Sequence, residues 1–215
     1  MAGAAHGSSM GKRGVAILEP AAVFLLIMAY IWWLRFHHPG FWVLILGLVL
    51  ASHAWRHENA ASLGFHLSNM RACLEEFTPA LALLALTLLA AGLLLQTTRP
   101  LRFEDGVLAW LGYLPWGLFQ QYMLNGYFQN RLAAVQSPRV AGATAAVLFG
   151  GVHLPNWFLM LVGFGAAWYC TRIWRKYQNL YFLGLAHATV GFLLYLVVPD
   201  SISHHLVVGP GFLGR

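Results

Sequence analysis

Charged side chains are scarce in this sequence. Lysine, arginine, aspartate and glutamate together make up 9% of its 215 residues, against about 25% in an average soluble domain. Apolar residues reach 59% and the mean hydropathy is +0.63, which is more apolar surface than a soluble fold can bury. Several apolar runs approach or exceed about 18 residues with hardly a charge, the length that crosses a hydrocarbon core. The composition excludes a water-soluble domain and predicts an all-α polytopic membrane protein.

Acidic residues are the scarcer of the charged residues, at 7 against 13 lysines and arginines. The basic residues are spread over short loops, which is typical of membrane anchoring and gives no reason to expect a nucleic-acid partner. Cysteine occurs twice, as Cys73 and Cys170, without the spacing of a metal site, so both are expected to be free packing cysteines. The sequence contains no Walker, Rossmann, HExxH or GxSxG motif. No cofactor and no metal is expected.

The apolar runs predict about seven membrane spans in one helical bundle. Segments rich in helix breakers, such as HHPG, TTRP and HLPN, separate the runs. The expected helices are Val15–Leu34, Phe41–Trp55, Phe77–Leu95, Gly106–Leu132, Val140–His153, Asn156–Ile173 and Asn179–Val198.

The parts outside the spans are short. Residues 1–14 are predicted to be disordered, 15–200 to form a single transmembrane domain, and 201–215 to form a C-terminal tail. The mixed stretch 56–76 is either an interfacial amphipathic helix or the polar start of the third span. Translation starts at either Met1 or Met10, because both precede plausible beginnings.

Basic residues predict the orientation in the membrane. With the N-terminus inside, nine lysines and arginines fall on the inner face and four on the outer face, which favours a cytoplasmic N-terminus in a bacterial-type inner or plasma membrane. The inner set is Lys12, Arg13, Arg56, Arg71, Arg131, Arg139, Arg172, Arg175 and Lys176; the outer set is Arg35, Arg99, Arg102 and Arg215.

One expected span carries a stripe of amides. Gln121, Asn125 and Gln129 are spaced four residues apart and share a helix face, with Gln120 on the adjacent face. Polar groups at membrane depth are costly and require an explanation. Two interpretations stay open: the amides hydrogen-bond helices together, or they line a functional cavity.

Two histidines lie at membrane depth or close to it. His153 ends the stretch LFGGVHLPN, shares a helix face with Phe149 and is followed by Asn156. His187 lies near the middle of the last span, in GLAHATVG. A histidine within a span is a functional candidate. Together with the amide stripe, the two histidines predict a convergent polar centre.

Three stretches carry a resemblance to a known family. QQYMLNGYFQNRL, LFGGVHLPN and GLAHATVGF resemble, in order and separation, the motifs EExxxR, FxxxH and HxxxN (or Asp) of the CPBP family. That family includes the type II CAAX prenyl endopeptidases and the Abi bacteriocin-processing and self-immunity membrane proteins. The resemblance covers about residues 106–192 and implies the CPBP-like helical fold for this core.

The resemblance also implies site residues. The family's first glutamates activate water, and its histidines assist. Carried over, Phe149, His153 and His187 match the family motifs, Gln120 and Gln121 stand at the glutamate positions, and Asn125 and Gly191 replace the arginine and the last polar residue. We expect His153, His187, Gln120, Gln121 and Asn125 to act in catalysis and Phe149 and Asn156 to bind substrate.

The amides change the expected chemistry. A neutral amide is no general base, although it orients water and donates hydrogen bonds. The first hypothesis is an intramembrane endopeptidase acting on a membrane-associated peptide or protein, with a histidine as base. The second is a catalytically inactive relative that binds a peptide or lipid or serves in immunity or assembly. A third, a small transporter-like bundle, lacks the inverted repeat it would need.

Overall fold

The computed structural model describes residues 4–214, with side chains described from residue 17 onward. This part of the chain is helical and contains no strand. Its helices are α1 (Ala4–Ala29), η1 (Tyr30–Leu34), α2 (Arg35–His37), η2 (Pro39–Phe41), α3 (Trp42–Trp55), α4 (Met70–Leu94), α5 (Phe103–Gln121), η3 (Tyr122–Gln129), α6 (Asn130–Ala133), α7 (Pro138–Gly151), α8 (Trp157–Tyr177), α9 (Leu180–Val197), α10 (Asp200–Ser203), η4 (His204–Leu206) and α11 (Pro210–Leu213).

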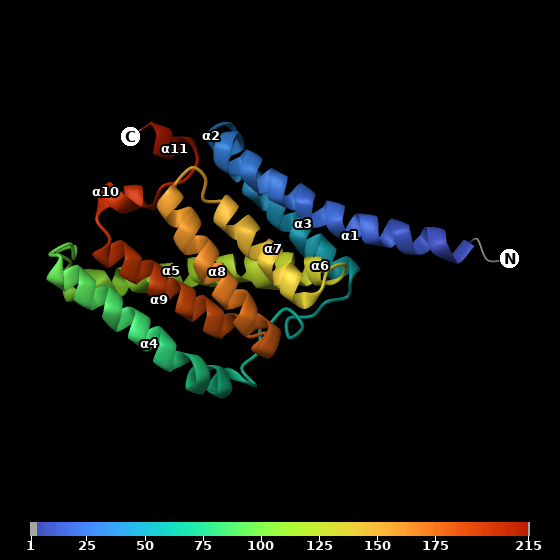
Figure 1. Ribbon diagram of the computed structural model, residues 1–215. Coiled ribbons are helices and arrows are strands. Elements are labelled where there is room, and N and C mark those ends of the chain that lie inside the picture. Colours follow the sequence, from blue (N-terminus) through green and yellow to red (C-terminus); the bar gives the residue numbers. More distant parts are fainter. Residues whose placement is uncertain (1–3, 215) are drawn as a thin grey trace.

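The long helices pack as a bundle (Figure 1). Helix α9 packs along α5 and is covered by α4, while α7 packs along α8. The segment η3 continues α5 and contacts α7, α8 and α9. Helices α1 and α3 lie against each other and close the bundle beside α6. The expected all-α bundle is confirmed.

Three helical segments are long and apolar enough to cross a membrane: Ile17–His37, Met70–Leu94 and Leu180–Val197. The segment Pro39–Trp55 is apolar but shorter. Large apolar side chains such as Leu83, Leu86 and Leu94 are exposed on α4. Outward-facing leucines are unfavourable in water and favourable in lipid, because lipid tails are as apolar as leucine.

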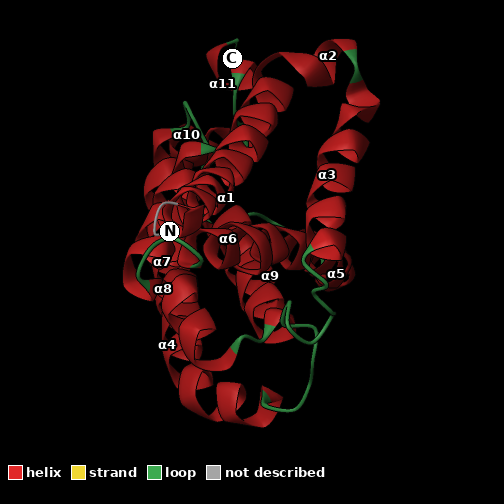
Figure 2. Ribbon diagram, turned by 90° about the vertical axis from the view of Figure 1, so that its right-hand side faces the viewer, coloured by secondary structure: helices red, strands yellow, loops and turns green. Residues whose placement is uncertain are grey.

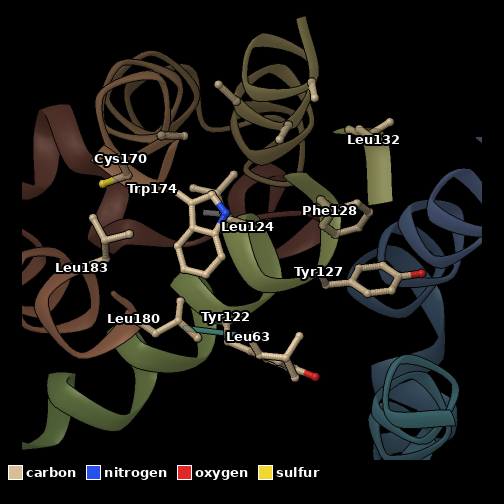
Figure 3. Close-up of a cluster of buried hydrophobic side chains, with 14 of the residues drawn as sticks. Leu63, Tyr122, Leu124, Tyr127, Phe128, Leu132, Cys170, Trp174, Leu180 and Leu183 are labelled. Carbon is tan, nitrogen blue, oxygen red and sulfur yellow. The ribbon is translucent and has the colours of Figure 1, made fainter. Parts of the chain in front are cut away.

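The buried core lies around the junction of α5 and η3. Figure 3 shows Leu124 of η3 with Cys170 and Trp174 of α8 and Leu180 and Leu183 of α9. Trp174, Leu124, Leu180 and Leu183 are each at most 2% exposed. The core therefore fixes η3 between α8 and α9.

Two glycines allow α5 and α9 to approach closely. A Cβ atom on Gly117 would lie 2.8 Å from the backbone oxygen of Gly184, and one on Gly184 would lie 2.9 Å from the Cα atom of Leu118. Small residues at helix crossings permit such backbone contact in membranes. The crossing lies one turn from Gln121 and from His187, so it sets the distance between those two side chains.

Two segments of the N-terminal half were only partly described by the sequence patterns. Helix α1 begins at Ala4, whereas the sequence predicts a disordered segment 1–14, and residues 1–3 lie outside the described part. The helix continues N-terminally because alanine, lysine and arginine favour helix; Figure 1 shows this end extending beyond the bundle. Residues 56–69 form a loop, seen in Figure 2, and 70–76 are the first turns of α4.

The C-terminal tail folds back on the bundle. The Gly209 amide donates to the Leu154 carbonyl oxygen (2.8 Å), and Arg35 Nη2 donates to the Val208 carbonyl oxygen (3.1 Å). Residues 201–214 therefore pack on the end of α7, the start of α8, and the segments η1 and α2 instead of leaving the bundle.

Candidate active site

The amide stripe lies where α5 changes into the π-helix η3. Gln121 is the last residue of α5, and Asn125 and Gln129 lie in η3. All three side chains are buried, with exposures of 1%, 0% and 2%. Segments of π-helix occur often at functional sites, because their wider turn re-aims side chains. The sequence pattern is thus realised as a buried polar stripe.

Gln121 connects the stripe to the last histidine. Its Nε2 atom donates to His187 Nδ1 on α9 (2.9 Å), and its Oε1 atom accepts from Asn125 Nδ2 (2.7 Å). These bonds form one directed chain from Asn125 through Gln121 to His187. Because Nδ1 accepts, neutral His187 carries its proton on Nε2.

His153 lies in the turn after α7 and is fixed by the backbone. Its Nδ1 atom is 2.7 Å from the Phe149 carbonyl oxygen. A carbonyl oxygen only accepts, so Nδ1 carries the proton and Nε2 is the basic nitrogen. Gly163 of α8 makes room for the ring, since a Cβ there would lie 3.2 Å from His153 Nδ1.

Phe149 stands beside both histidines. Its ring centroid is 5.1 Å from that of His153 and 6.0 Å from that of His187, with edge-on geometry in both cases. The two imidazoles are therefore neighbours across one aromatic ring. They are held in opposite tautomers: Nε2 is an acceptor in His153 and a donor in His187.

A large apolar cavity opens beside these rings. It has a volume of about 1540 Å³ and is bounded by residues of α1, α3, α4, α5, α7, α8 and α9. Gln120, Phe149, His153 and His187 line it. Gln121 and Asn125 lie behind His187, outside the lining. Most of the wall is aliphatic or aromatic, and its polar side chains include the two histidines, Gln120, Arg35 and several tyrosines.

Asn156 and Gly191 supply no polar side chain to the cavity. Asn156 is 0% exposed and caps α8, where its Oδ1 atom accepts from the Leu159 amide (3.1 Å) and its Nδ2 atom donates to Ser203 and Val207 carbonyl oxygens. Asn156 therefore binds the C-terminal tail and does not line the cavity. Gly191 lies against an aromatic ring, because a Cβ atom there would be 3.4 Å from the ring of Tyr113.

The environment of Gln121 includes a thiol. Cys170 of α8 lies beside Gln121, and both cysteines are free and buried, as expected. Gln129 donates to the Thr171 carbonyl oxygen (3.1 Å). The part of the stripe beyond Asn125 therefore joins η3 to α8. Within residues 17–214, no group of three or more His, Cys, Asp or Glu side chains converges as metal ligands.

A second polar cluster lies at the end of η3. Arg131 is 3% exposed and donates through Nη1 and Nη2 to both Glu58 carboxylate oxygens (2.8 and 2.6 Å). Its Nε atom donates to Glu19 Oε1 (3.1 Å) and Ser52 Oγ (3.0 Å). Tyr127 points from η3 toward α1 and α3 (Figure 3) and donates to Glu19. The cluster ties α1, α3 and the following loop to α6.

Glu58 lies in the loop after α3 and titrates abnormally. Burial by itself raises the pKa of this carboxyl, but hydrogen bonds from Arg131 and His53 outweigh burial and hold the pKa below its ordinary 4.5. His53 Nδ1 lies 2.6 Å from Glu58 Oε2 and 2.9 Å from Arg131 Nη2. No sequence pattern predicts this cluster, because its members are separated by up to 112 residues.

One family of known proteins matches part of the chain. Residues 105–193 match the family model described as type II CAAX prenyl endopeptidase Rce1-like; comparisons with curated proteins and with solved structures gave no match. The matched segment runs from α5 to α9 and contains Gln121, Asn125, His153 and His187. The resemblance to the CPBP family is confirmed. The chain is an integral membrane protein whose residues 105–193 are similar to the type II CAAX prenyl endopeptidase Rce1-like family.

Proposed function

We propose that this CAAX-protease-like protein is an intramembrane endopeptidase that cuts a membrane-associated peptide or protein. One observation carries the proposal: two histidines in opposite tautomers line the same cavity beside Phe149. A basic nitrogen and an N–H donor are the two groups that addition of water to a carbonyl requires. The apolar chamber suits a substrate that arrives from the bilayer.

The two histidines have different roles in the proposed reaction. His153 Nε2 accepts a proton from water as its oxygen attacks the scissile carbonyl carbon. His187 Nε2–H donates to the carbonyl oxygen as that oxygen gains negative charge. When the tetrahedral intermediate collapses, the C–N bond breaks and protonated His153 gives its proton to the leaving nitrogen. The substrate carbonyl becomes a carboxyl group, and the enzyme returns to its starting state.

The amides position these groups and carry no proton themselves. Gln121 holds His187 in the donor tautomer, and Asn125 orients Gln121. Gln120 lines the cavity, where its amide can orient the attacking water. In the described part of the chain no carboxylate lines this cavity, so the role of the family's glutamate falls to His153.

Cleavage of membrane peptides tests the proposal. The purified protein is incubated in vesicles with a library of membrane-tethered peptides, and products are identified by mass spectrometry. We expect wild-type cleavage and a loss of about 10²-fold or more in His153→Ala, since general base catalysis contributes about 10²–10⁴-fold. His187→Ala loses a comparable factor, because one oxyanion donor is worth about 10²–10³-fold. Cleavage that persists in both variants would reject the assigned roles.

A second candidate function rests on the amides themselves. Gln120, Gln121 and Asn125 leave the site without the carboxylate that the family uses, which favours a catalytically inactive relative that binds a peptide or lipid or serves in immunity or assembly. This alternative predicts peptide binding without products. It also predicts that Gln121→Glu gains cleavage by restoring the family's carboxylate, whereas the histidine mechanism predicts that Gln121→Glu gains none.

We further propose a cytoplasmic N-terminus in a bacterial-type inner or plasma membrane. Arg56, Arg131, Arg139 and Arg175 come from segments near one end of the bundle, and excess positive charge marks the cytoplasmic side of short loops. A reporter fused to the N-terminus and one placed after Arg99 should report opposite sides. Reporters on the same side would contradict this orientation.

A further inference from the structure

Three arginines line a small pocket between α7 and α8. Arg139 comes from the first turn of α7, and Arg172 and Arg175 from the last turns of α8. The pocket has a volume of about 280 Å³, and its other walls are Ala143, Trp168 and Thr171. It lies apart from the histidine cavity, whose lining shares none of these residues.

The pocket carries positive charge without a partner. Across residues 17–214, no carboxylate forms an ion pair with any of the three arginines, whereas Arg56, Arg71, Arg99 and Arg131 all have one. Among the described residues, the single side-chain hydrogen bond of these three arginines is a long one from Arg175 Nη1 to the Thr171 carbonyl oxygen (3.4 Å). Three neighbouring guanidinium groups repel one another, so an anion in the pocket would be stabilised.

Helix dipoles account for part of the arrangement only. Arg172 and Arg175 lie at the C-terminus of α8, where the macrodipole favours cations. Arg139 lies at the N-terminus of α7, two residues after the cap Ser137, where the dipole disfavours a cation and favours an anion. Arg139 is therefore poorly placed as a lone charge and well placed as an anion ligand.

The chain also makes room for this group. A Cβ atom on Gly142 would lie 2.8 Å from Arg175 Nη1, so glycine there lets the guanidinium reach across α7. Trp168 is 44% exposed beside it, and tryptophan is enriched at the level of lipid headgroups. Basic pockets between membrane helices bind anionic headgroups.

We propose that Arg139, Arg172 and Arg175 bind the phosphate of an anionic phospholipid headgroup. In this site the guanidinium forks bind the phosphate oxygens; the proposal puts Trp168 at the level of the headgroups and the acyl chains along the exposed apolar side chains of α8. The site is independent of the proposed peptidase activity.

Lipid binding to the purified full-length protein tests this site. Native mass spectrometry in neutral detergent measures the affinity for phosphatidylglycerol, for phosphatidylcholine and for inorganic phosphate. The double variant R139Q/R172Q should bind phosphatidylglycerol about 25-fold more weakly, from about fivefold for each arginine, with phosphatidylcholine binding unchanged. Ala143→Phe fills the pocket, keeps all three charges and should lose phosphatidylglycerol to a similar degree.

Arg71→Gln is the matched control. Its side chain is 91% exposed and paired with Glu75, so it removes one positive charge away from the pocket and should retain the wild-type affinity. Ala143→Phe decides the question should R139Q/R172Q fail to fold. Unchanged phosphatidylglycerol binding in Ala143→Phe, or an equal loss in Arg71→Gln, would overturn the proposal. Inorganic phosphate binding as tightly as phosphatidylglycerol would overturn its assignment to a lipid.

Discussion

At the scale of single residues, Gln121 has the most connected side chain of the candidate site. It donates to His187 and accepts from Asn125, so its replacement leaves both partners without their hydrogen bond. An apolar residue of similar size cannot replace either bond. Without the hydrogen bond from Gln121, the proton of neutral His187 can occupy either ring nitrogen.

Gln121→Leu is expected to lower the free energy of unfolding by about 1 kcal/mol, the usual worth of a polar contact between membrane helices. The measurement is reversible unfolding in mixed micelles. Gln120→Leu is the control, because Gln120 makes no hydrogen bond within the described residues and should change stability little. Equal effects of the two substitutions would show that the Gln121 bonds contribute nothing.

Arg131 is the residue whose loss should cost most outside the site. Arg131→Met leaves Glu19 and Glu58 without their main partner, and breaking a buried pair costs about 3–5 kcal/mol. Both carboxylates are 22% exposed, so we expect about 2–3 kcal/mol after allowance for solvent. Arg71→Met removes an exposed pair and should cost less than about 0.5 kcal/mol. The same unfolding measurement compares them.

At the scale of helices, the crossing of α5 and α9 controls the site. Gly184→Ala places a methyl group 2.9 Å from the Leu118 Cα atom, which forces the helices apart and costs about 1–3 kcal/mol. We also expect loss of cleavage, because Gln121 and His187 separate. Gly112→Ala on α5 meets nothing within 4 Å and serves as control. Unfolding free energies and cleavage rates of both variants are measured. A Gly184→Ala protein as stable and active as wild type would contradict the claim that α5 and α9 must approach closely at this crossing.

The helices themselves were largely predictable. Apolar length and breakers placed α3, α7 and α9 within about two residues of their ends, within the usual error of such predictions. The start of α1 and the loop 56–69 could not be predicted in this way, because neither depends on an apolar run. The loop is fixed by tertiary contacts, such as Glu58 with Arg131, that no local pattern contains.

The candidate site was also predictable in part, because some of its residues follow local sequence patterns. The spacing of Gln121 and Asn125 places them on one face of a helix, and the family motifs point to His153 and His187. The family resemblance predicts that Asn156 binds substrate, but in the structure its side chain caps α8 by accepting from the Leu159 amide. The proximity of Cys170 to Gln121 involves two helices that are distant in sequence, so no local pattern predicts it.

At the scale of the whole molecule, the Glu58 cluster makes stability depend on pH. Because the folded pKa of Glu58 lies below 4.5, the unfolded chain binds its proton first as the pH falls. The stabilisation is complete above about pH 5 and is lost as the pH falls through the folded pKa, below about 4.5. Melting temperatures measured from pH 7 to pH 3 should fall at the acid end, and Glu58→Gln should flatten this fall. An identical pH profile in Glu58→Gln would contradict the assignment.

The bundle as a whole surrounds an apolar cavity lined by His153 and His187, and Arg131, Glu19 and Glu58 form a separate charged cluster. Membrane interiors penalise unpaired charge, and the neutral amides Gln121 and Asn125 beside His187 meet that constraint. The central claim is that the Gln121 amide and the Phe149 carbonyl hold the two histidines in opposite tautomers. It needs no knowledge of the substrate to be tested.

Nitrogen-15 NMR of histidine-labelled protein in lipid bilayers measures those tautomers directly. Signals are assigned by comparison with His153→Gln and His187→Gln, and the spectra are recorded at pH 7.5. We expect a protonated Nδ1 and bare Nε2 in His153, and a bare Nδ1 and protonated Nε2 in His187. Both histidines in one tautomer, or a protonated Nδ1 in His187, would contradict the claim.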